Sequence, residues 1–262
     1  MQSIPVLPGT QARALALVHN PDVEIAAVAA VVEHDPAITT ALLRAANSAA
    51  SAPINRVTTA ERAVMRIGLR GTQQIVASSV LQSSFGDLER AGIDLDELWR
   101  HLLGCALVAD QMLLARERSA GFTAGLLHDL GRLSLAHAEP ESYGRVVAAV
   151  RRGADPREAE RTVFGDDHEQ RGAAVAAAWD LPDELAEAVA HHHEPSGSLL
   201  PHAVADARRL IAAIGIGDGV GLPPAPPEEL PAEDRVLLSG LGGEAALLTR
   251  LDWFEGALAA AA

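Results

Sequence analysis

Histidine, a common ligand of divalent metals, is concentrated in one stretch of this 262-residue chain. Eight of the ten histidines lie between positions 101 and 206, together with aspartates that could share an ion with them. The eight are His101, His128, His137, His168, His191, His192, His193 and His202. Because first-row divalent metals bind imidazole and carboxylate groups, this stretch predicts a metal site.

A compact site would take one ligand, or one adjacent pair, from each of five predicted helices. The predicted ligands are His101, His128, Asp129, His168, His192, His193 and Asp206. Seven ligands exceed the needs of one zinc ion, but they suit two first-row metals that share a carboxylate and a hydroxide. Such a pair would activate water against a phosphoryl centre. The ligand types do not distinguish Fe, Mn, Zn, Ni or Mg.

Several of the candidates also have a simpler interpretation. His101 lies on an apolar stripe, where a histidine is more often a hydrogen-bonded core residue. His168 lies in a predicted first turn and could face solvent, whereas the triplet 191–193 could complement a helix dipole when protonated. We assign His137 to the surface and His191 to a position outside the ligand set.

The elements that must position these residues are predicted to be helices, because apolar residues recur every three or four positions. Helices are expected at 9–19, 22–33, 37–46, 63–68, 72–84, 96–115, 122–137, 167–178, 180–193 and 199–214. Residues 231–262 return to a helical pattern after a Gly- and Pro-rich stretch. Asp35 is interpreted as a helix N-cap, and Asp166 with Glu169 as a capping box. With no strand pattern evident, the predicted fold class is all-α.

Three regions are expected. Residues 1–92 would form an N-terminal helical subdomain, and residues 93–217 would form the helical subdomain with the metal site. Residues 218–262 would form a Gly/Pro-rich linker and a helical tail.

The composition narrows the class of protein. Hydrophobic residues make up 48% of the chain and aromatic residues only 3%, which favours close-packed helices over a β-sandwich. A formal net charge of −14 disfavours nucleic acid or an anionic membrane as the main partner. The one cysteine, Cys105, excludes an internal disulfide and fits a reducing cytosol. No apolar run reaches the roughly 18 residues of a membrane span, so we expect a cytoplasmic protein.

Several motifs resemble a known superfamily. His101, the pair His128-Asp129 within AGLLHDLG, and Asp206 resemble in their order the H…HD…D signature of the HD metal-dependent phosphohydrolases. His168 and His192-His193-Glu194 are similar to the HD-GYP cyclic dinucleotide phosphodiesterases. Upstream, the segments EHDPA, LLRAANS and AVMRIG resemble the HDOD domain, the HD-related output domain of bacterial signalling proteins. This last resemblance runs from about Leu7 to Gly217.

The chain also departs from the catalytic pattern. PSGS follows Glu194, so the Gly-Tyr-Pro motif is absent, and Arg132 stands where HD enzymes commonly have lysine. HDOD domains are generally regarded as non-catalytic relatives, yet all seven metal-type positions hold His or Asp.

The resemblance implies an HD-domain-like helical bundle preceded by an N-terminal helical subdomain. The function it implies is a bacterial signal-transduction module that binds a kinase, another regulator or a nucleotide ligand and keeps a divalent metal site. The alternative is a metal-dependent phosphohydrolase or phosphodiesterase acting on a nucleotide or cyclic dinucleotide. In that enzyme the metal pair would generate hydroxide, Asp129 and Arg132 would be the catalytic residues, and Arg132 would help to hold phosphate.

Overall fold

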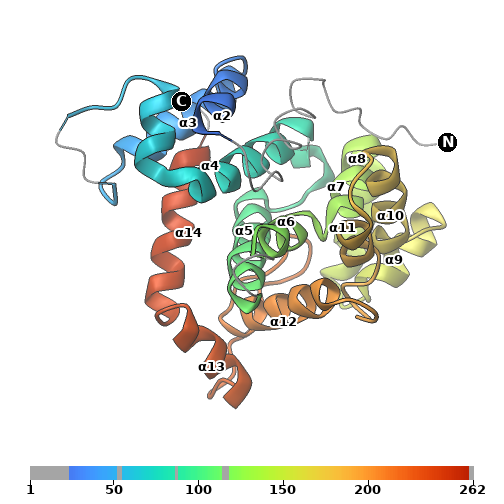
Figure 1. Ribbon diagram of the computed structural model, residues 1–262. Helices are drawn as coiled ribbons and strands as arrows, with labels where there is room; N and C mark the ends of the chain where they lie inside the picture. Colours follow the sequence, from blue (N-terminus) through green and yellow to red (C-terminus); the bar gives the residue numbers. More distant parts are fainter. Residues whose placement is uncertain (1–23, 52–54, 86–87, 114–117, 260–262) are drawn as a thin grey trace. The chain divides into compact units, whose positions relative to one another are not determined.

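The computed structural model describes residues 24–51, 55–85, 88–113 and 118–259. Every regular element among them is helical, which confirms the all-α prediction (Figure 1). The elements are α2 (Ile25–Val32), α3 (Pro36–Asn47), α4 (Ala60–Ser84), η1 (Leu88–Ala91), α5 (Leu95–Met112), α6 (Arg118–Leu127), α7 (Leu130–Ala138), α8 (Pro140–Val150), α9 (Pro156–Phe164), α10 (His168–Ala178), α11 (Asp183–Ala190), α12 (Leu199–Ala213), α13 (Ala232–Gly240) and α14 (Glu244–Leu258). Within the described residues, no helix is both long and apolar enough to cross a membrane.

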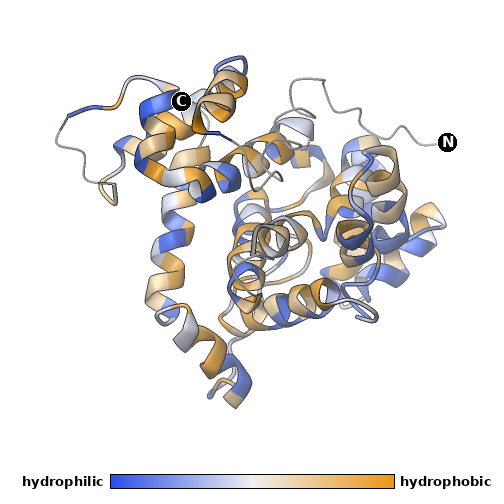
Figure 2. Ribbon diagram, viewed as in Figure 1, coloured by the Kyte–Doolittle hydropathy of each residue, from blue (hydrophilic) through white to orange (hydrophobic). Residues whose placement is uncertain are grey.

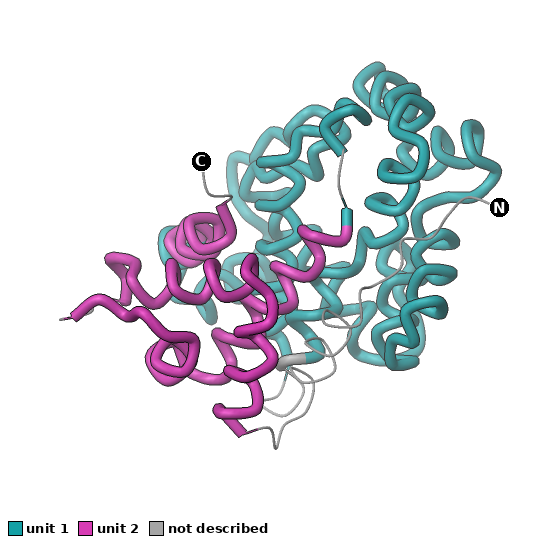
Figure 3. The backbone as a smooth tube through the Cα atoms, turned by 90° about the horizontal axis from the view of Figure 1, so that it is seen from above, with its two compact units in different colours: residues 1–6, 85–247 teal, residues 7–84, 248–262 magenta. Residues whose placement is uncertain are grey.

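The chain divides into two compact units (Figure 3). Unit 1 comprises residues 1–6 and 85–247, and unit 2 comprises residues 7–84 and 248–262. This division differs from the three regions expected from the sequence, because residues beyond 217 are shared between the units. Part of the glycine-rich stretch packs on α5, where the Asp94 N–H donates to Gly219 O. The end of α14 packs in unit 2, where the Trp253 indole donates to Ser48 Oγ.

Unit 2 follows its sequence signals closely. The Asp35 carboxylate accepts hydrogen bonds from two backbone N–H groups of the first turn of α3, which confirms the predicted N-cap. Gly68 interrupts α4 with a φ of 82°, a left-handed conformation that glycine adopts without strain. The predicted helix 9–19 lies outside the described residues.

Unit 1 is built around α5, which packs against α6 and α12. Helix α10 packs between α7 and α11, and α11 packs against α12. Figure 2 shows hydrophobic and hydrophilic residues side by side on most helices, as expected of elements with one buried face.

Two glycines permit unusually close helix approaches in unit 1. A Cβ at Gly125 of α6 would lie 2.6 Å from the Cys105 carbonyl oxygen of α5. A Cβ at Gly131 of α7 would lie 1.9 Å from the His168 carbonyl oxygen of α10. Because only glycine fits at these crossings, it brings the helices that carry the candidate ligands into contact.

Three local predictions for unit 1 need correction. The helix expected at 122–137 is two helices, which separate at His128-Asp129. Helices α8 and α9 were not predicted. The capping box of α10 is formed by Asp167 and Gln170, one residue beyond the predicted pair.

Candidate metal centre

The pair His128-Asp129 lies in the break between α6 and α7, and both side chains are fully buried. In a regular helix, adjacent side chains point about 100° apart, which would direct the two groups to different places. Here Asp129 has φ −92° and ψ 22°, outside the regular helical region. The break therefore lets both residues face one centre.

Two imidazoles are oriented by backbone carbonyl groups. His128 Nδ1–H donates to Gly125 O at 2.7 Å, and His192 Nδ1–H donates to Val189 O at 2.9 Å. In these tautomers each Nε2 carries a lone pair. Both Nε2 atoms are buried and have no hydrogen-bond partner within the described part of the chain. An outer-shell acceptor on one ring nitrogen and a free lone pair on the other are typical of metal-binding histidines.

A third imidazole, His168, is oriented by a buried carboxylate that was not predicted. Glu160 Oε2 accepts from His168 Nδ1 at 2.6 Å and from the His168 backbone N–H at 2.9 Å. The other oxygen, Oε1, accepts from the Tyr143 hydroxyl at 2.8 Å. This arrangement directs His168 Nε2 toward His193 Nε2, which lies 2.9 Å away.

The Asp129 carboxylate lies at the middle of these imidazoles. Its Oδ1 is 3.6 Å from both His168 Nε2 and His192 Nε2, and its Oδ2 is 3.5 Å from His128 Nε2. With bonds of about 2.1 Å to one ion, adjacent ligand atoms lie roughly 3.0–3.4 Å apart. The observed separations are close to those edges and too long for direct hydrogen bonds. The donor set therefore fits a divalent metal.

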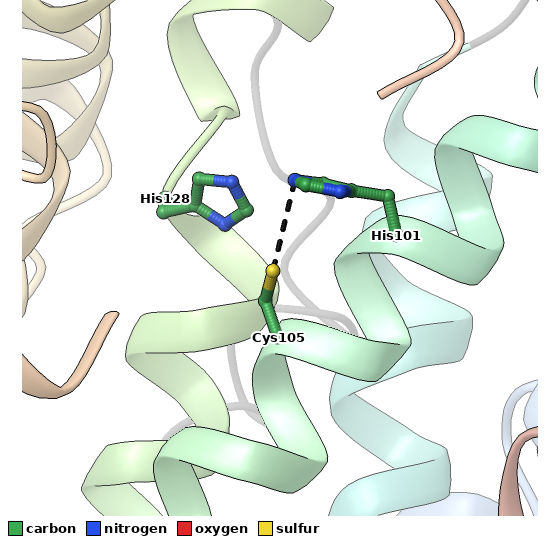
Figure 4. Close-up of side chains that lie close together, drawn as sticks. All are labelled: His101, Cys105 and His128. Carbon is green, nitrogen blue, oxygen red and sulfur yellow. Dashed lines mark hydrogen bonds between the residues drawn. The ribbon is translucent and has the colours of Figure 1, made fainter. Parts of the chain in front are cut away.

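The ligand atoms fall into two groups, each within 4.8 Å. One group is His101, Cys105 and His128; the other is His168, His192 and His193. Figure 4 shows the three side chains of the first group facing one another, with His101 Nε2 3.6 Å from Cys105 Sγ. Cys105 was not predicted as a ligand, although its position four residues after His101 on α5 places it on the same helix face.

Arg132 is fully buried beside Asp129 Oδ2, the oxygen that faces His128 of the first group. Its Nη1 is 2.9 Å from Asp129 Oδ2, as an ion pair without hydrogen-bond geometry, and donates to Asp218 Oδ2 at 2.8 Å. Asp218 was expected to lie in a linker. Instead, its Oδ1 accepts from the backbone N–H groups of Val220 and Gly221, which hold the carboxylate against the centre.

The structure does not bring Asp206 to these ligands. Its side chain is 46% exposed, and Oδ1 accepts from Arg209 Nη2 at 3.1 Å on the same helix, α12. The residue of α12 that reaches the centre is Arg208, whose Nη2 lies 3.3 Å from His193 Nε2. Of the seven predicted ligands, six therefore lie together and Asp206 lies apart.

Burial and charge set the protonation of the cluster. Burial lowers the pKa of His101 and His192 to about 4, against the opposing effect of Asp129. Burial alone would raise the pKa of Asp129, but the Arg132 guanidinium and nearby imidazoles hold it well below its usual value. Burial likewise opposes ionisation of Asp218, whose pKa Arg132 and His101 nevertheless lower. At neutral pH the imidazoles of His101, His128 and His192 are uncharged and the carboxylates of Asp129 and Asp218 ionised, the forms that bind metals.

Comparison with known proteins agrees with this architecture. The model of the HDOD domain family matches residues 4–195. A Treponema pallidum (strain Nichols) protein of uncharacterized function is 30% identical over 224 residues, which cover 83% of this chain and 42% of the relative. The chain thus spans less than half of that relative's length.

Three crystal structures have a similar fold. A candidate phosphohydrolase of Shewanella amazonensis SB2B has a TM-score of 0.70 and 25% identity, with 97% of this chain and 95% of that chain covered. An HDOD domain protein of unknown function from Geobacter sulfurreducens has a TM-score of 0.70 and 21% identity, with 95% and 89% covered. A candidate signal transduction protein of Marinobacter aquaeolei VT8 has a TM-score of 0.74 and 23% identity, with 96% and 58% covered. The shared fold confirms the predicted HD-like helical architecture.

Proposed function

Because the chain belongs to the HDOD domain family, we propose that it is a regulatory module of bacterial signalling that holds a divalent metal in an HD-type pocket. One observation carries the metal assignment. His192 Nε2 and Asp129 Oδ1 are buried, lack hydrogen-bond partners in the described chain and lie 3.6 Å apart, and His168 Nε2 lies at the same distance from that oxygen. Left without a cation, such buried polar atoms would be costly.

The proposed ligands differ from the sequence-based set in one carboxylate. We retain His101, His128, Asp129, His168, His192 and His193 as candidates, and we replace Asp206 by Asp218 as the second carboxylate of the pocket. This exchange is supported by the ion pairs of Arg132, whose guanidinium contacts both Asp218 and Asp129.

The same geometry favours regulation over turnover. His128, Asp129, His168 and His192 are fully buried, so a phosphorylated substrate would reach them only after the helices moved apart. Arg132 is fully buried between two carboxylates, and its guanidinium is not directed at a phosphate. We therefore propose that the module acts by binding, with a signalling protein such as a kinase or another regulator as partner, or with a nucleotide as ligand. The acidic balance disfavours nucleic acid.

A phosphohydrolase or phosphodiesterase is the second candidate. It is favoured by the position of Asp129 between two groups of potential metal ligands, because a carboxylate shared by two ions is a feature of metal-assisted phosphoryl hydrolysis. The Shewanella amazonensis relative, a candidate phosphohydrolase, is consistent with this alternative.

The test is elemental analysis of protein purified without chelator. We expect near-stoichiometric metal in the wild type and its loss in the double variant His128→Ala, Asp129→Ala. The matched control is the double variant His202→Ala, Asp206→Asn, which removes the same residue types from an exposed and a half-buried position of α12 and should keep the metal. Less than about a tenth of an equivalent in the wild type would refute the metal site.

Turnover is measured on the same samples with a generic phosphodiester and cyclic dinucleotides. Stoichiometric metal without hydrolysis supports the regulatory module. Hydrolysis that disappears in the His128→Ala, Asp129→Ala variant, but not in the α12 control, would support the enzyme instead.

A further inference from the structure

The two groups of ligands differ in the cation that already accompanies them. The Arg132 guanidinium contacts Asp129 Oδ2, the oxygen that faces His128 of the first group, and Asp218 Oδ2, at 2.9 and 2.8 Å. A divalent ion in that group would draw on the same two oxygen atoms. The Asp129 oxygen that faces the second group, Oδ1, has no hydrogen-bond partner in the described structure.

We propose that Arg132 takes the place of one metal ion, so that the pocket binds a single divalent cation, held by His168, His192, His193 and Asp129 Oδ1. This inference rests on the proposed metal site and specifies its stoichiometry. It makes the pocket a mononuclear centre with an internal guanidinium where a two-metal hydrolase would have its second ion.

Formal charge supports one ion rather than two. Asp129, Asp218 and Glu160 contribute three formal negative charges, and Arg132, ion-paired with the first two, contributes one positive charge. One divalent ion would leave these groups with no net formal charge, whereas a second ion would leave two net positive charges in a buried site. Repulsion between cations is poorly screened where water is excluded.

The two arginines near the pocket, Arg208 and Arg132, also differ in the contacts that hold them. Arg208 is half-buried, and its guanidinium contacts the two ring nitrogens of His193 at 3.4 and 3.3 Å. Arg132 is fully buried and ion-paired on two sides. An incoming ion therefore competes with two long contacts to an imidazole at Arg208, but with two short ion pairs at Arg132.

The orientation of the imidazoles also favours the second group as the site of the single ion. In the second group, His168 and His192 each donate Nδ1–H to a fixed acceptor. In the first group His128 has such an anchor at Gly125 O, but His101 has none among the described residues, because its Nδ1 is buried without a partner and its Nε2 faces Cys105. The second group is thus the better prepared for an ion.

The wild type is tested by titrating chelator-treated protein with Mn²⁺ and following bound metal by equilibrium dialysis and electron paramagnetic resonance. We expect saturation at one equivalent, with the spectrum of an isolated Mn²⁺ ion. Saturation at two equivalents, with the exchange-coupled spectrum of ions that share a carboxylate, would overturn the inference and leave the metal site standing. Absence of bound metal would overturn the proposed function as well.

The variant Arg132→Ala should open the first group and raise the stoichiometry to two, with a coupled spectrum. Arg209→Ala is the matched control, because it removes an ion-paired arginine of α12 that contacts Asp206 and Asp234 and lies outside the ligand groups. The control should remain at one equivalent. A folded Arg132→Ala protein, as judged by cooperative unfolding, that still binds only one ion would contradict the inference. If this variant does not fold, the stoichiometry measured for the wild type tests the inference.

Discussion

Glu160 offers the most direct test of how the fold prepares this centre. The residue is fully buried on α9, and one of its oxygens accepts both the backbone N–H and the Nδ1–H of His168. Glu160→Gln preserves the shape of the side chain but removes its charge. The neutral amide accepts more weakly and also presents an NH₂ group, which must face either His168 or the Tyr143 hydroxyl.

The size of the effect follows from these contacts. A hydrogen bond to a charged group contributes about 1.5–3 kcal/mol, and loss of an outer-shell partner typically weakens metal binding about 10- to 100-fold. The two figures agree, because each tenfold change in affinity corresponds to about 1.4 kcal/mol. We therefore expect Glu160→Gln to raise the metal Kd about 10- to 100-fold while the helices remain folded.

The measurement is competition for Zn²⁺ against a chromophoric chelator, with circular dichroism to check folding. Tyr143→Phe is the control, because it removes only the donor to the other Glu160 oxygen and leaves both His168 contacts in place; its Kd should change by less than about tenfold. A folded Glu160→Gln protein that binds Zn²⁺ within about twofold of the wild type would show that the carboxylate does not prepare His168.

Two further predictions concern stability, each measured by urea unfolding. Gly131→Ala should lower the free energy of unfolding by about 3 kcal/mol or more, because its Cβ would lie 1.9 Å from a backbone oxygen. The control Gly144→Ala, whose nearest neighbour lies at 3.7 Å, should be neutral or stabilising by up to about 1 kcal/mol. Equal effects of the two substitutions would show that the close approach at Gly131 is not required. In chelator, the protein should lose stability as the pH falls from 6.5 toward 4, because the unfolded chain protonates His101 and His192 while burial keeps them neutral in the folded state. Each histidine contributes a slope of roughly 1.4 kcal/mol per pH unit, so a flat profile across this range would contradict their burial as neutral groups.

The chemical types of the ligands and the order of most helices could be predicted from the sequence. His128 and His168 could be predicted as ligands because the histidines are clustered in the sequence and because apolar residues recur at helical spacing around them. The second carboxylate of the pocket could not be predicted from the sequence. Asp206 was chosen for its place in the motif order, but the buried face of α12 is set by Leu200, Val204 and Ala207, and Asp206 does not share it.

The residue that takes its place lies in a stretch whose glycines suggest a linker. In the structure the same glycines allow close packing on α5: Gly219 has a φ of 76°, and a Cβ there would lie 2.4 Å from the Asp94 carbonyl oxygen. This contact holds the loop that presents Asp218. Glycine content alone does not separate a tight turn from a flexible chain, because both require the same conformational freedom.

Glu160 was not predicted, for a different reason. Its role depends on a contact between α9 and the first turn of α10, and α9 was not among the predicted helices. A glutamate in an amphipathic segment is most often a solvated charge. Only the tertiary structure reveals that this one is buried against Tyr143 and His168.

The burial of the centre decides how a bound ion would act. Catalytic metal sites keep an open coordination position, whereas structural sites are closed by protein ligands. An ion held by Asp129, His168, His192 and His193 would connect the start of α7, the first turn of α10 and the segment after α11. It would therefore act mainly on the packing of these helices, with a stabilisation of about 2.7 kcal/mol when free metal exceeds Kd 100-fold. A module whose helix packing depends on a bound ion can couple metal supply to the surface that it offers a signalling partner, and this coupling requires no hydrolysis.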